Sequence, residues 1–213
     1  MRKDSSSLIK IWNQVPPDYY EKGVQNNFLQ RLWHNQKIST LKKILNGKEF
    51  KTVCDAGCAG GYMTGQLAGI LPKSKIFGLD VYQTAINHAS KKYKKIKFIC
   101  CDLHQIPIKS KFFDLVVCYE TIEHVITPQK VLQELKQITK NDGTIILAMD
   151  SGHPLFRIAW FIWERTKGSV WRNAHLHPFN PRQLETIIKK EGLKVEKKLF
   201  SNFGMEVVFI LKK

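Results

Sequence analysis

Val53-Cys54-Asp55-Ala56-Gly57-Cys58-Ala59-Gly60-Gly61 joins an apolar run to a helical pattern, and this stretch decides the fold. Glycines at a strand-to-helix turn let the backbone approach a ligand closely, and they accept a positive φ that other residues avoid. A glycine-rich loop also occurs as a turn that serves only packing. The loop therefore predicts a ligand site only together with acidic residues elsewhere in the chain.

Short β-branched runs and helical patterns alternate on both sides of this loop. Five runs have the composition of buried strands: residues 50–54, 75–79, 96–101, 113–118 and 144–149. Such alternation predicts an α/β fold with a mainly parallel sheet and helices on both faces. Two further alternating runs, residues 193–200 and 205–211, surround Asn202-Phe203-Gly204 and predict an antiparallel C-terminal hairpin. The expected sheet therefore has seven strands.

The length and composition favour one packed domain. The chain has 213 residues, of which 43% are hydrophobic, and this is enough to bury a full core. We expect residues 1–49 to form an N-terminal helical lead-in, with a helix over residues 27–45. Residues 50–213 are expected to form the main domain, with helices over residues 129–139 and 181–191. An insert over residues 151–180 follows the fifth strand.

The formal net charge of +16 raises the question of a polyanionic partner. Lysines are spread along the chain, with one dense cluster at residues 91–97. Because charge runs are usually solvated faces, we interpret them mainly as surface, and a polyanion or an acidic lipid remains the alternative partner.

Cysteine usage and the N-terminus indicate a cytoplasmic protein. The five cysteines lie mostly in apolar runs, at positions 54, 58, 100, 101 and 118, without disulfide or zinc spacing. We expect them to be reduced core residues. No signal-peptide pattern is found at the N-terminus, and the most apolar run, residues 155–163, is too short to span a membrane.

Two aspartates follow the strands next to the glycine loop. Asp80 ends the second strand and Asp102 ends the third. Ligands of an open α/β sheet bind outside the carboxyl ends of the strands, so these carboxylates should converge on one crevice. A carboxylate about 20 residues after the loop can accept both ribose hydroxyls, which suits a nicotinamide cofactor or S-adenosylmethionine. Asp55 favours the second, because a carboxylate there suits a cationic amino-acid group and repels a pyrophosphate; alternatively it hydrogen-bonds only its own loop.

The loop resembles that of the class I S-adenosylmethionine-dependent methyltransferases, and the resemblance covers nearly all of residues 50–213. Their pattern D-x-G-x-G-x-G is matched by Asp55, Gly57 and Gly61, whereas Ala59 replaces the middle glycine. The resemblance implies a Rossmann-like fold that ends in an antiparallel hairpin, with S-adenosylmethionine as the cofactor. It also implies that Asp80 holds the ribose, and it gives the following cofactor-binding set: Asp55, Gly57, Cys58, Ala59, Gly61, Asp80, Val81 on adenine, Asp102 and Leu103 at its amino edge, and Tyr119.

Residues 112–125 are similar to the fourth strand and following loop of ubiquinone-type O-methyltransferases and their small-molecule relatives. By this resemblance Tyr119 and Glu120 line the site, and His124 is the candidate catalytic base. A histidine suits this task because its ordinary pKa of ~6.5 lies near working pH. The alternative is a core histidine that anchors the loop. Asp114 is expected to tie the sheet together.

A metal site is the second interpretation of this segment. Glu120, Glu123 and His124, together with His175, resemble the ligand set of small-RNA 2′-O-methyltransferases. The same Glu-His pair is common in relatives without a metal. We therefore predict no metal.

The insert is unusually aromatic. Trp160, Phe161 and Trp163 lie near Arg157, Arg165 and Lys167, a composition found at membrane interfaces, so residues 154–167 predict either a peripheral membrane contact or a lid over an apolar pocket. Both alternatives favour a small, apolar or lipid-like acceptor, such as a quinone precursor. The predicted acceptor-binding residues are Glu120, Trp160 and His175, with His177 beside them.

The sequence thus predicts methyl transfer to a small molecule, and three alternatives remain. RNA methylation is favoured by the charge, but no RNA-binding module is recognisable, so nucleic acid is the less favoured partner. Asp55, Asp80 and Asp102 weigh against a non-catalytic cofactor-binding protein, and Asp55 with the C-terminal hairpin weighs against a nicotinamide oxidoreductase. Asp18-Tyr19-Tyr20 and Trp33-His34 either close over the cofactor or pack on the sheet.

Overall fold

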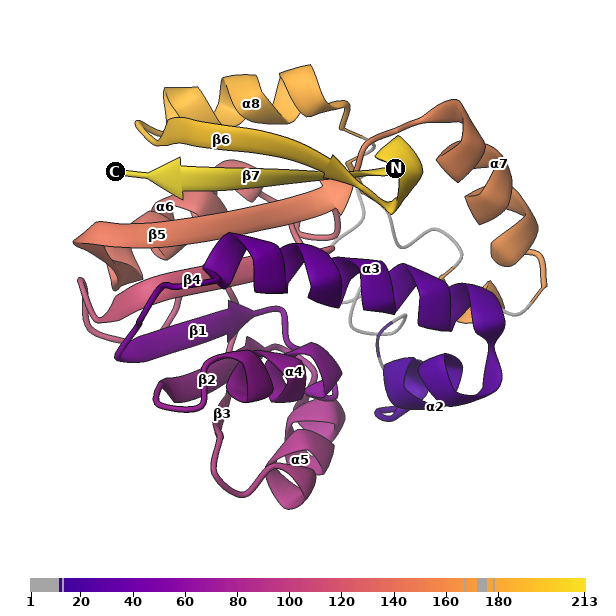
Figure 1. Cartoon of the computed structure of the whole chain (residues 1–213), viewed down its shortest axis with the longest axis horizontal. Coiled ribbons are helices and arrows are strands. Elements are labelled where there is room, and N and C mark those ends of the chain that lie inside the picture. The colour runs from indigo at the N-terminus through magenta and orange to yellow at the C-terminus, as the bar shows by residue number, and fades with distance from the viewer. Residues whose placement is uncertain (1–11, 13, 167, 172–175, 178) are drawn as a thin grey trace.

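The computed structural model describes residues 12, 14–166, 168–171, 176–177 and 179–213, and its centre is one seven-stranded sheet (Figure 1). The strand order is β3-β2-β1-β4-β5-β7-β6. Strands β1 to β5 are parallel, and β7 is antiparallel to both β5 and β6. The strands are β1 (Thr52–Ala56), β2 (Lys75–Asp80), β3 (Lys97–Cys100), β4 (Phe113–Tyr119), β5 (Thr139–Asp150), β6 (Lys194–Ser201) and β7 (Glu206–Lys212). The predicted sheet and C-terminal hairpin are confirmed.

Helices cover both faces of the sheet because successive strand residues point to opposite sides. Val116 packs in the core under α6 and α8, whereas Val117 packs in the core under α3 and α4. In Figure 1, α3 and α4 lie in front of the sheet and α6 and α8 behind it. The helices are α2 (Tyr19–Asn26), α3 (Phe28–Leu45), α4 (Tyr62–Ile70), α5 (Gln83–Lys92), α6 (Pro128–Ile138), α7 (Pro154–Trp163) and α8 (Pro181–Lys190). Short 3-10 turns are η1 (Ser169–Trp171) and η2 (Asn202–Gly204).

Strand β5 differs most from its prediction. It begins at Thr139, five residues before the expected start at residue 144, and Asn141-Asp142-Gly143 lies inside it instead of before it. The pairing with β4 shifts register there, since Phe113 pairs with Thr139 but Leu115 pairs with Thr144. The residues between form a bulge, which explains why turn residues occur within a strand.

Asp114 ties β4 to the start of β1, as expected. Its Oδ2 accepts hydrogen bonds from the backbone N–H groups of Lys51 (3.0 Å) and Thr52 (2.8 Å), and its Oδ1 pairs with Lys140 Nζ at 2.6 Å. These partners hold the pKa of the Asp114 carboxyl below its usual range despite partial burial, which on its own would raise it. The group is therefore structural.

The described helices include none that is long and apolar enough to cross a membrane. The five cysteines form no disulfide, and three of them, Cys54, Cys58 and Cys118, are buried. The lysines of the cluster at residues 91–97 are exposed, which agrees with a solvated face.

Candidate cofactor and acceptor site

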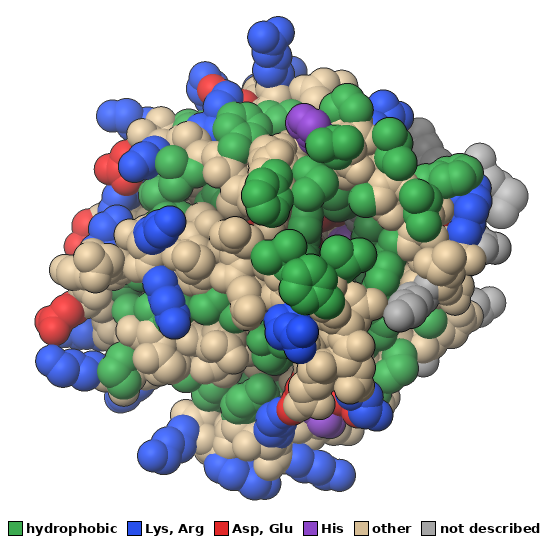
Figure 2. Space-filling model, turned by 45° about the vertical axis from the view of Figure 1, so that its right-hand side comes forward, with side chains coloured by type: hydrophobic (Ala, Val, Ile, Leu, Met, Phe, Trp, Pro, Cys, Tyr) green, Lys and Arg blue, Asp and Glu red, His purple; other side chains and the backbone are tan. Residues whose placement is uncertain are grey.

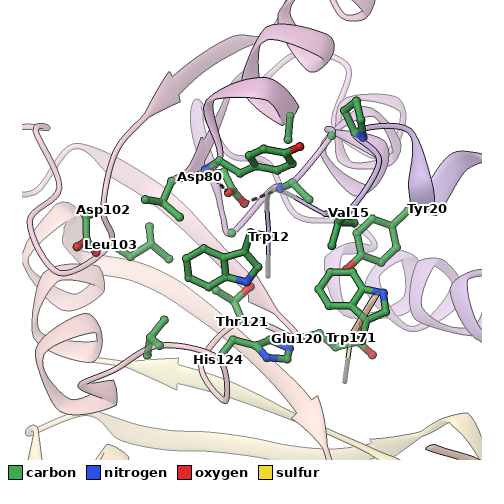
Figure 3. Close-up of a pocket in the computed structure, with 18 of the residues that line it drawn as sticks. Trp12, Val15, Tyr20, Asp80, Asp102, Leu103, Glu120, Thr121, His124 and Trp171 are labelled. Atoms are coloured by element: carbon green, nitrogen blue, oxygen red, sulfur yellow. Dashed lines mark hydrogen bonds between the residues drawn. The ribbon is translucent and has the colours of Figure 1, made fainter. Parts of the chain in front are cut away.

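A cavity of about 140 Å³ lies at the carboxyl ends of β1, β2 and β4 and beside the segment that follows β3. Asp102 and Leu103 form one end of it, and Tyr20 and Trp171 form the other (Figure 3). Its walls combine the glycine loop, the strand ends and the N-terminal segment before α2: Trp12, Val15, Pro16, Pro17, Tyr20, Gly57, Ala59, Gly60, Asp80, Val81, Tyr82, Ala85, Asp102, Leu103, His104, Glu120, Thr121, His124, Val125, Ile126 and Trp171.

The glycine loop between β1 and α4 presents its backbone to the cavity. Gly57 has a φ of +85°, and a Cβ there would lie 2.2 Å from Thr121 Oγ1. A Cβ on Gly60 would lie 1.8 Å from the Pro17 carbonyl oxygen, so the N-terminal segment packs directly on this glycine. Ala59 adopts a φ of +45°, a conformation that favours glycine. Alanine at the middle position of the motif therefore keeps the loop shape at some cost in backbone strain.

Asp80 anchors this loop and faces the cavity. Its Oδ2 accepts the Ala59 N–H at 2.8 Å, and its Oδ1 accepts the Tyr82 N–H at 2.9 Å (Figure 3). Burial raises the pKa of the Asp80 carboxyl, although the backbone donors oppose this shift. Each carboxylate oxygen can accept a second hydrogen bond, so the group can still take ribose hydroxyls.

At the end of the cavity formed by Asp102 and Leu103, a histidine that the sequence analysis did not predict fixes the Asp102 carboxylate. His104 Nε2 accepts the Thr127 N–H at 3.1 Å, so its Nδ1 carries the proton and donates to Asp102 Oδ1 at 2.6 Å. The backbone N–H of His104 donates to the same oxygen at 2.9 Å. The Asp102 carboxylate is thereby fixed beside Leu103, where the resemblance predicts the adenine edge.

Four predicted cofactor-binding residues lie behind the cavity wall instead of in it: Asp55, Cys58, Gly61 and Tyr119. Asp55 is buried, and its Oδ2 accepts the Thr64 hydroxyl at 2.7 Å. Burial raises the pKa of the Asp55 carboxyl to about 6. The partner lies on α4 and not, as the alternative predicts, in the loop, and direct contact of these four residues with a cofactor stays a prediction.

Glu120 turns away from β4 toward α3. It has a φ of +46°, its Oε1 accepts the Trp33 indole N–H at 2.9 Å, and its Oε2 forms an ion pair with the buried Lys37. Burial alone would raise the pKa of the Glu120 carboxyl, but the Lys37 ammonium holds it well below its usual range. Glu120 therefore stays charged and links the loop after β4 to α3. Its predicted role in acceptor binding is not tested by this arrangement.

His124 lines the cavity, and its ring centroid lies 6.3 Å from that of Trp171. The neighbouring Glu123 is buried, with one carboxyl oxygen lacking a hydrogen-bond partner, and burial raises its pKa well above the usual range. Among the residues that the structure describes, no three His, Cys, Asp or Glu side chains come close enough to hold a metal ion. His175, the fourth proposed ligand and a predicted acceptor-binding residue, lies outside the described residues.

The N-terminal segment closes one side of the cavity. Tyr20 lies in the wall, with its ring 6.1 Å from Trp171 and 5.5 Å from His34. Burial lowers the pKa of His34 to about 3, so it is a neutral packing residue. Trp12 and Trp171 are wall residues that the sequence analysis did not predict. Tyr20 also lines the cavity, and its closure over the cofactor stays a prediction. Trp160, predicted to bind the acceptor, stacks on Phe156 at 5.8 Å and is not in the wall.

Three comparisons identify proteins with the same organisation. Residues 54–147 match the family described as Methyltransferase domain. The chain is 27% identical over 141 residues to the malonyl-[acyl-carrier protein] O-methyltransferase of Bacillus cereus, which covers 65% of this chain and 52% of the relative. It is 25% identical over 175 residues to the ubiquinone biosynthesis O-methyltransferase of Rickettsia prowazekii, covering 78% of this chain and 68% of the relative.

The solved structures agree in fold. Magnesium protoporphyrin IX methyltransferase from Synechocystis, solved with bound S-adenosylhomocysteine (SAH), superposes with a TM-score of 0.74 over 99% of this chain and 100% of its own at 18% identity. The sheet order, the glycine loop and the acids at the strand ends thus define a class I, Rossmann-like methyltransferase fold. Residues 54–147 thus match a methyltransferase domain, and the predicted resemblance, fold and S-adenosylmethionine cofactor are confirmed. It spans about half the length of the first curated relatives that it matches.

Proposed function

We propose that this chain transfers the methyl group of S-adenosylmethionine to a small, apolar or lipid-like acceptor that carries a hydroxyl group. The observation that carries the proposal is that one cavity is lined by the glycine loop and Asp80 and also by the aromatic side chains of Tyr20 and Trp171. The site fits the cofactor, because the loop at Gly57, Ala59 and Gly60 lines it and each carboxylate oxygen of Asp80 can accept a further hydrogen bond.

The chain's own residues divide into two groups along this cavity. Asp80 would hold the ribose hydroxyls, while Val81 and Leu103 supply apolar contact and Asp102 an acceptor for the adenine end. The bound cofactor supplies an already activated methyl group, so the protein mainly has to orient the acceptor and exclude water. Tyr20 and Trp171 are suited to both tasks, because aromatic side chains bury apolar acceptors and close the cavity toward solvent.

His124 is the proposed base for the acceptor hydroxyl. Its side chain lines the cavity wall, and an imidazole there can take up the proton of an acceptor hydroxyl. Its position beside Trp171 puts it at the aromatic end, where the acceptor is proposed to bind. Replacing His124 by alanine should preserve SAH affinity and abolish most turnover, since general-base catalysis contributes about 10²- to 10⁴-fold.

The proposed location is the cytoplasm, with peripheral membrane contact through residues 154–167. Free cysteines fit a reducing compartment. An apolar acceptor partitions into membranes, so a protein that methylates it gains from working at their surface.

The test combines binding and turnover. Calorimetric titration with S-adenosylmethionine, SAH and NAD should give binding of the first two only. Methyl transfer is then measured with radiolabelled S-adenosylmethionine on octyl gallate, on gallic acid as its matched control without the apolar tail, on a total lipid extract, and on bulk transfer RNA. Label in octyl gallate or lipid, with little in gallic acid, supports the proposal.

Each alternative predicts a different result in the same assay. The net charge of +16 favours RNA methylation, which predicts salt-sensitive label in transfer RNA alone. A non-catalytic cofactor-binding protein predicts SAH binding without transfer to any of the four acceptors. Binding of NAD alone would contradict both the cofactor and the proposed activity. Unchanged turnover in His124→Ala would refute the role of His124 as the base, but it would not contradict the proposed acceptor class.

A further inference from the structure

One face of the molecule gathers exposed apolar side chains from three elements far apart in the sequence. Large hydrophobic residues with more than half of their surface exposed lie at the start of α3, along α7 and at the β6–β7 turn: Phe28, Leu29, Leu155, Ile158, Phe161, Ile162, Phe200 and Phe203. Figure 2 shows hydrophobic side chains collected around a hollow on one side of the molecule. We call the set formed by residues 28–32, 154–162 and 200–203 the apolar face.

Contacts between these elements make the face continuous. The Trp33 ring of α3 lies 5.8 Å from the Phe156 ring of α7. The Ser151 hydroxyl, just before α7, donates to the Gly204 carbonyl oxygen of η2 at 2.6 Å. The three elements therefore surround one area instead of exposing separate residues, and large continuous apolar patches mark interaction sites.

Helix α7 turns an aliphatic side outward. Phe156, Trp160 and Trp163 are half-buried against the protein, whereas Leu155, Ile158 and Ile162 repeat every three or four residues on the other side. Ile158 is 60% exposed. A helix at a protein surface normally presents polar residues to water, so this arrangement needs a partner for its outer side.

Phe203 provides an independent indication of function. It lies at the tip of the β6–β7 hairpin with a φ of +57°, next to Asn202 with a φ of +50°. Hairpin turns with two such residues prefer Asn-Gly, and a bulky residue in the second position is strained. The phenyl ring is nevertheless 73% exposed, so the fold gains little packing in return. Backbone strain that is not offset by packing within the protein indicates that the side chain serves a function, such as contact with a partner.

The charge of the face selects the partner. Within residues 28–32, 154–162 and 200–203 the charged side chains are Arg31 and Arg157, and these ranges contain no Asp or Glu. A second copy of the chain docked symmetrically on this face would set these cations against one another. Anionic lipid headgroups complement them, and exposed aliphatic and aromatic side chains beside arginine suit the boundary between headgroups and acyl chains.

We propose that the apolar face docks the protein on an anionic membrane, with α7, the start of α3 and the Phe203 tip inserted together. The inference rests on the proposed membrane contact and extends it from helix α7 to a surface formed by three elements. Trp33 joins this surface to the cavity, since its ring contacts Phe156 and its N–H donates to Glu120. An acceptor dissolved in the membrane would therefore approach the cavity from the docked side.

The experiment is co-sedimentation of the full chain with vesicles of phosphatidylcholine alone or phosphatidylcholine with phosphatidylglycerol. Phe203→Gly should leave thermal stability unchanged or raised, because glycine relieves the positive φ, yet lower vesicle affinity at least about tenfold. Ile158→Asn should lower it similarly. Arg31→Ser/Arg157→Ser should weaken binding more than the matched double variant Lys94→Ser/Lys95→Ser, which removes the same charge from the lysine cluster.

SAH affinity, measured on each variant, separates this inference from the proposed function. Binding to anionic vesicles that the face variants lose, with SAH affinity retained, supports the docking surface even where no acceptor is methylated. Absence of binding at low salt overturns it, and so does an equal loss in the two charge variants, which would indicate unspecific attraction. Self-association of the wild-type chain that Phe203→Gly abolishes, seen by sedimentation velocity without vesicles, would assign the face to a second copy instead.

Discussion

Replacing Lys37 by methionine should destabilise the fold through the carboxylate that it leaves behind. Lys37 is 2% exposed on α3 and forms an ion pair with Glu120, which retains only the Trp33 N–H when the ammonium is removed. Methionine fills most of the same volume, so the packing loss is small. Breaking a buried pair by removing one partner costs about 3–5 kcal/mol. The Glu120 side chain is 26% exposed and keeps the indole hydrogen bond, so the expected loss lies near the lower end, about 3 kcal/mol.

The loss should depend on pH in a defined direction. In the wild-type chain the pKa of Glu120 is lowered, so its charge contributes stability above its ordinary pKa, and this contribution disappears as the pH falls through the folded-state value. In Lys37→Met, burial without the ammonium raises the pKa, and the carboxyl takes up a proton as the pH falls. The difference between the two proteins in free energy of unfolding should therefore shrink from pH 7 to about pH 4.

Urea denaturation followed by circular dichroism measures this difference. Adding Glu120→Gln to Lys37→Met should recover most of the stability, because the neutral amide still accepts the Trp33 N–H. Lys73→Met is the matched control, since its partner Glu49 and Lys73 itself are more than four-fifths exposed and the pair should contribute less than about 1 kcal/mol. A loss below about 1 kcal/mol in Lys37→Met, or no recovery in the double variant, would refute the argument.

Three further substitutions test the cradle and its buried acid. Gly60→Ala should lower SAH affinity in calorimetry, because its Cβ would lie 1.8 Å from the Pro17 carbonyl oxygen, whereas Gly69→Ala meets nothing within 4 Å and should stabilise the fold by about 0.5–1 kcal/mol. Asp80→Ala should weaken SAH binding at least about tenfold, since the ribose acceptor and the loop anchor are lost together. The Asp55 pKa of about 6 predicts that its ionisation costs about 3 kcal/mol of stability as the pH rises from about 4 through 6, a slope that Asp55→Asn should lack in denaturant titrations.

Specific results would contradict these expectations. Equal SAH affinity in Gly60→Ala and Gly69→Ala would mean that the N-terminal segment does not close the cavity. Undiminished binding in Asp80→Ala would place the ribose elsewhere; the exposed Asp142→Ala serves as its control. An identical pH slope in the wild-type chain and Asp55→Asn would mean that the carboxyl is not held in an apolar environment.

The parts of the fold that local chemistry specifies were predictable. The sequence pattern identified all seven strands, with every boundary except the start of β5 within two residues, because buried parallel strands need continuous apolar composition and the hairpin strands alternate. The start of β5 was missed since a bulge carries the Asn141-Asp142-Gly143 signal of a turn. Local composition alone does not distinguish a turn that ends a helix from one absorbed into a strand.

The site residues also divide into those that the sequence predicts and those that it does not. Asp80 and Asp102 follow strand ends, so the parallel sheet itself brings them to one edge, and the prediction needed no tertiary knowledge. Trp12 and Trp171 lie far in sequence from Asp80 and Asp102, and an isolated tryptophan carries no signal of which surface it will cover. Lys37 was missed for a related reason: a lysine in a polar helix is usually solvated, and only its pairing with Glu120 makes burial tolerable.

This division bears on where acceptor specificity resides. The segment that matches the family, residues 54–147, contains the glycine loop, Asp80 and Asp102, which are proposed to hold the cofactor, and His124, the proposed base. The aromatic end of the cavity comes from outside this segment, with Tyr20 from α2 and Trp171 from the insert. The similar proteins carry different names: a malonyl-[acyl-carrier protein] O-methyltransferase, a ubiquinone biosynthesis O-methyltransferase and a magnesium protoporphyrin IX methyltransferase. Because function on a shared fold depends on the elements added to it, Tyr20 and Trp171 are the residues whose substitution should change the acceptor while leaving SAH affinity least affected.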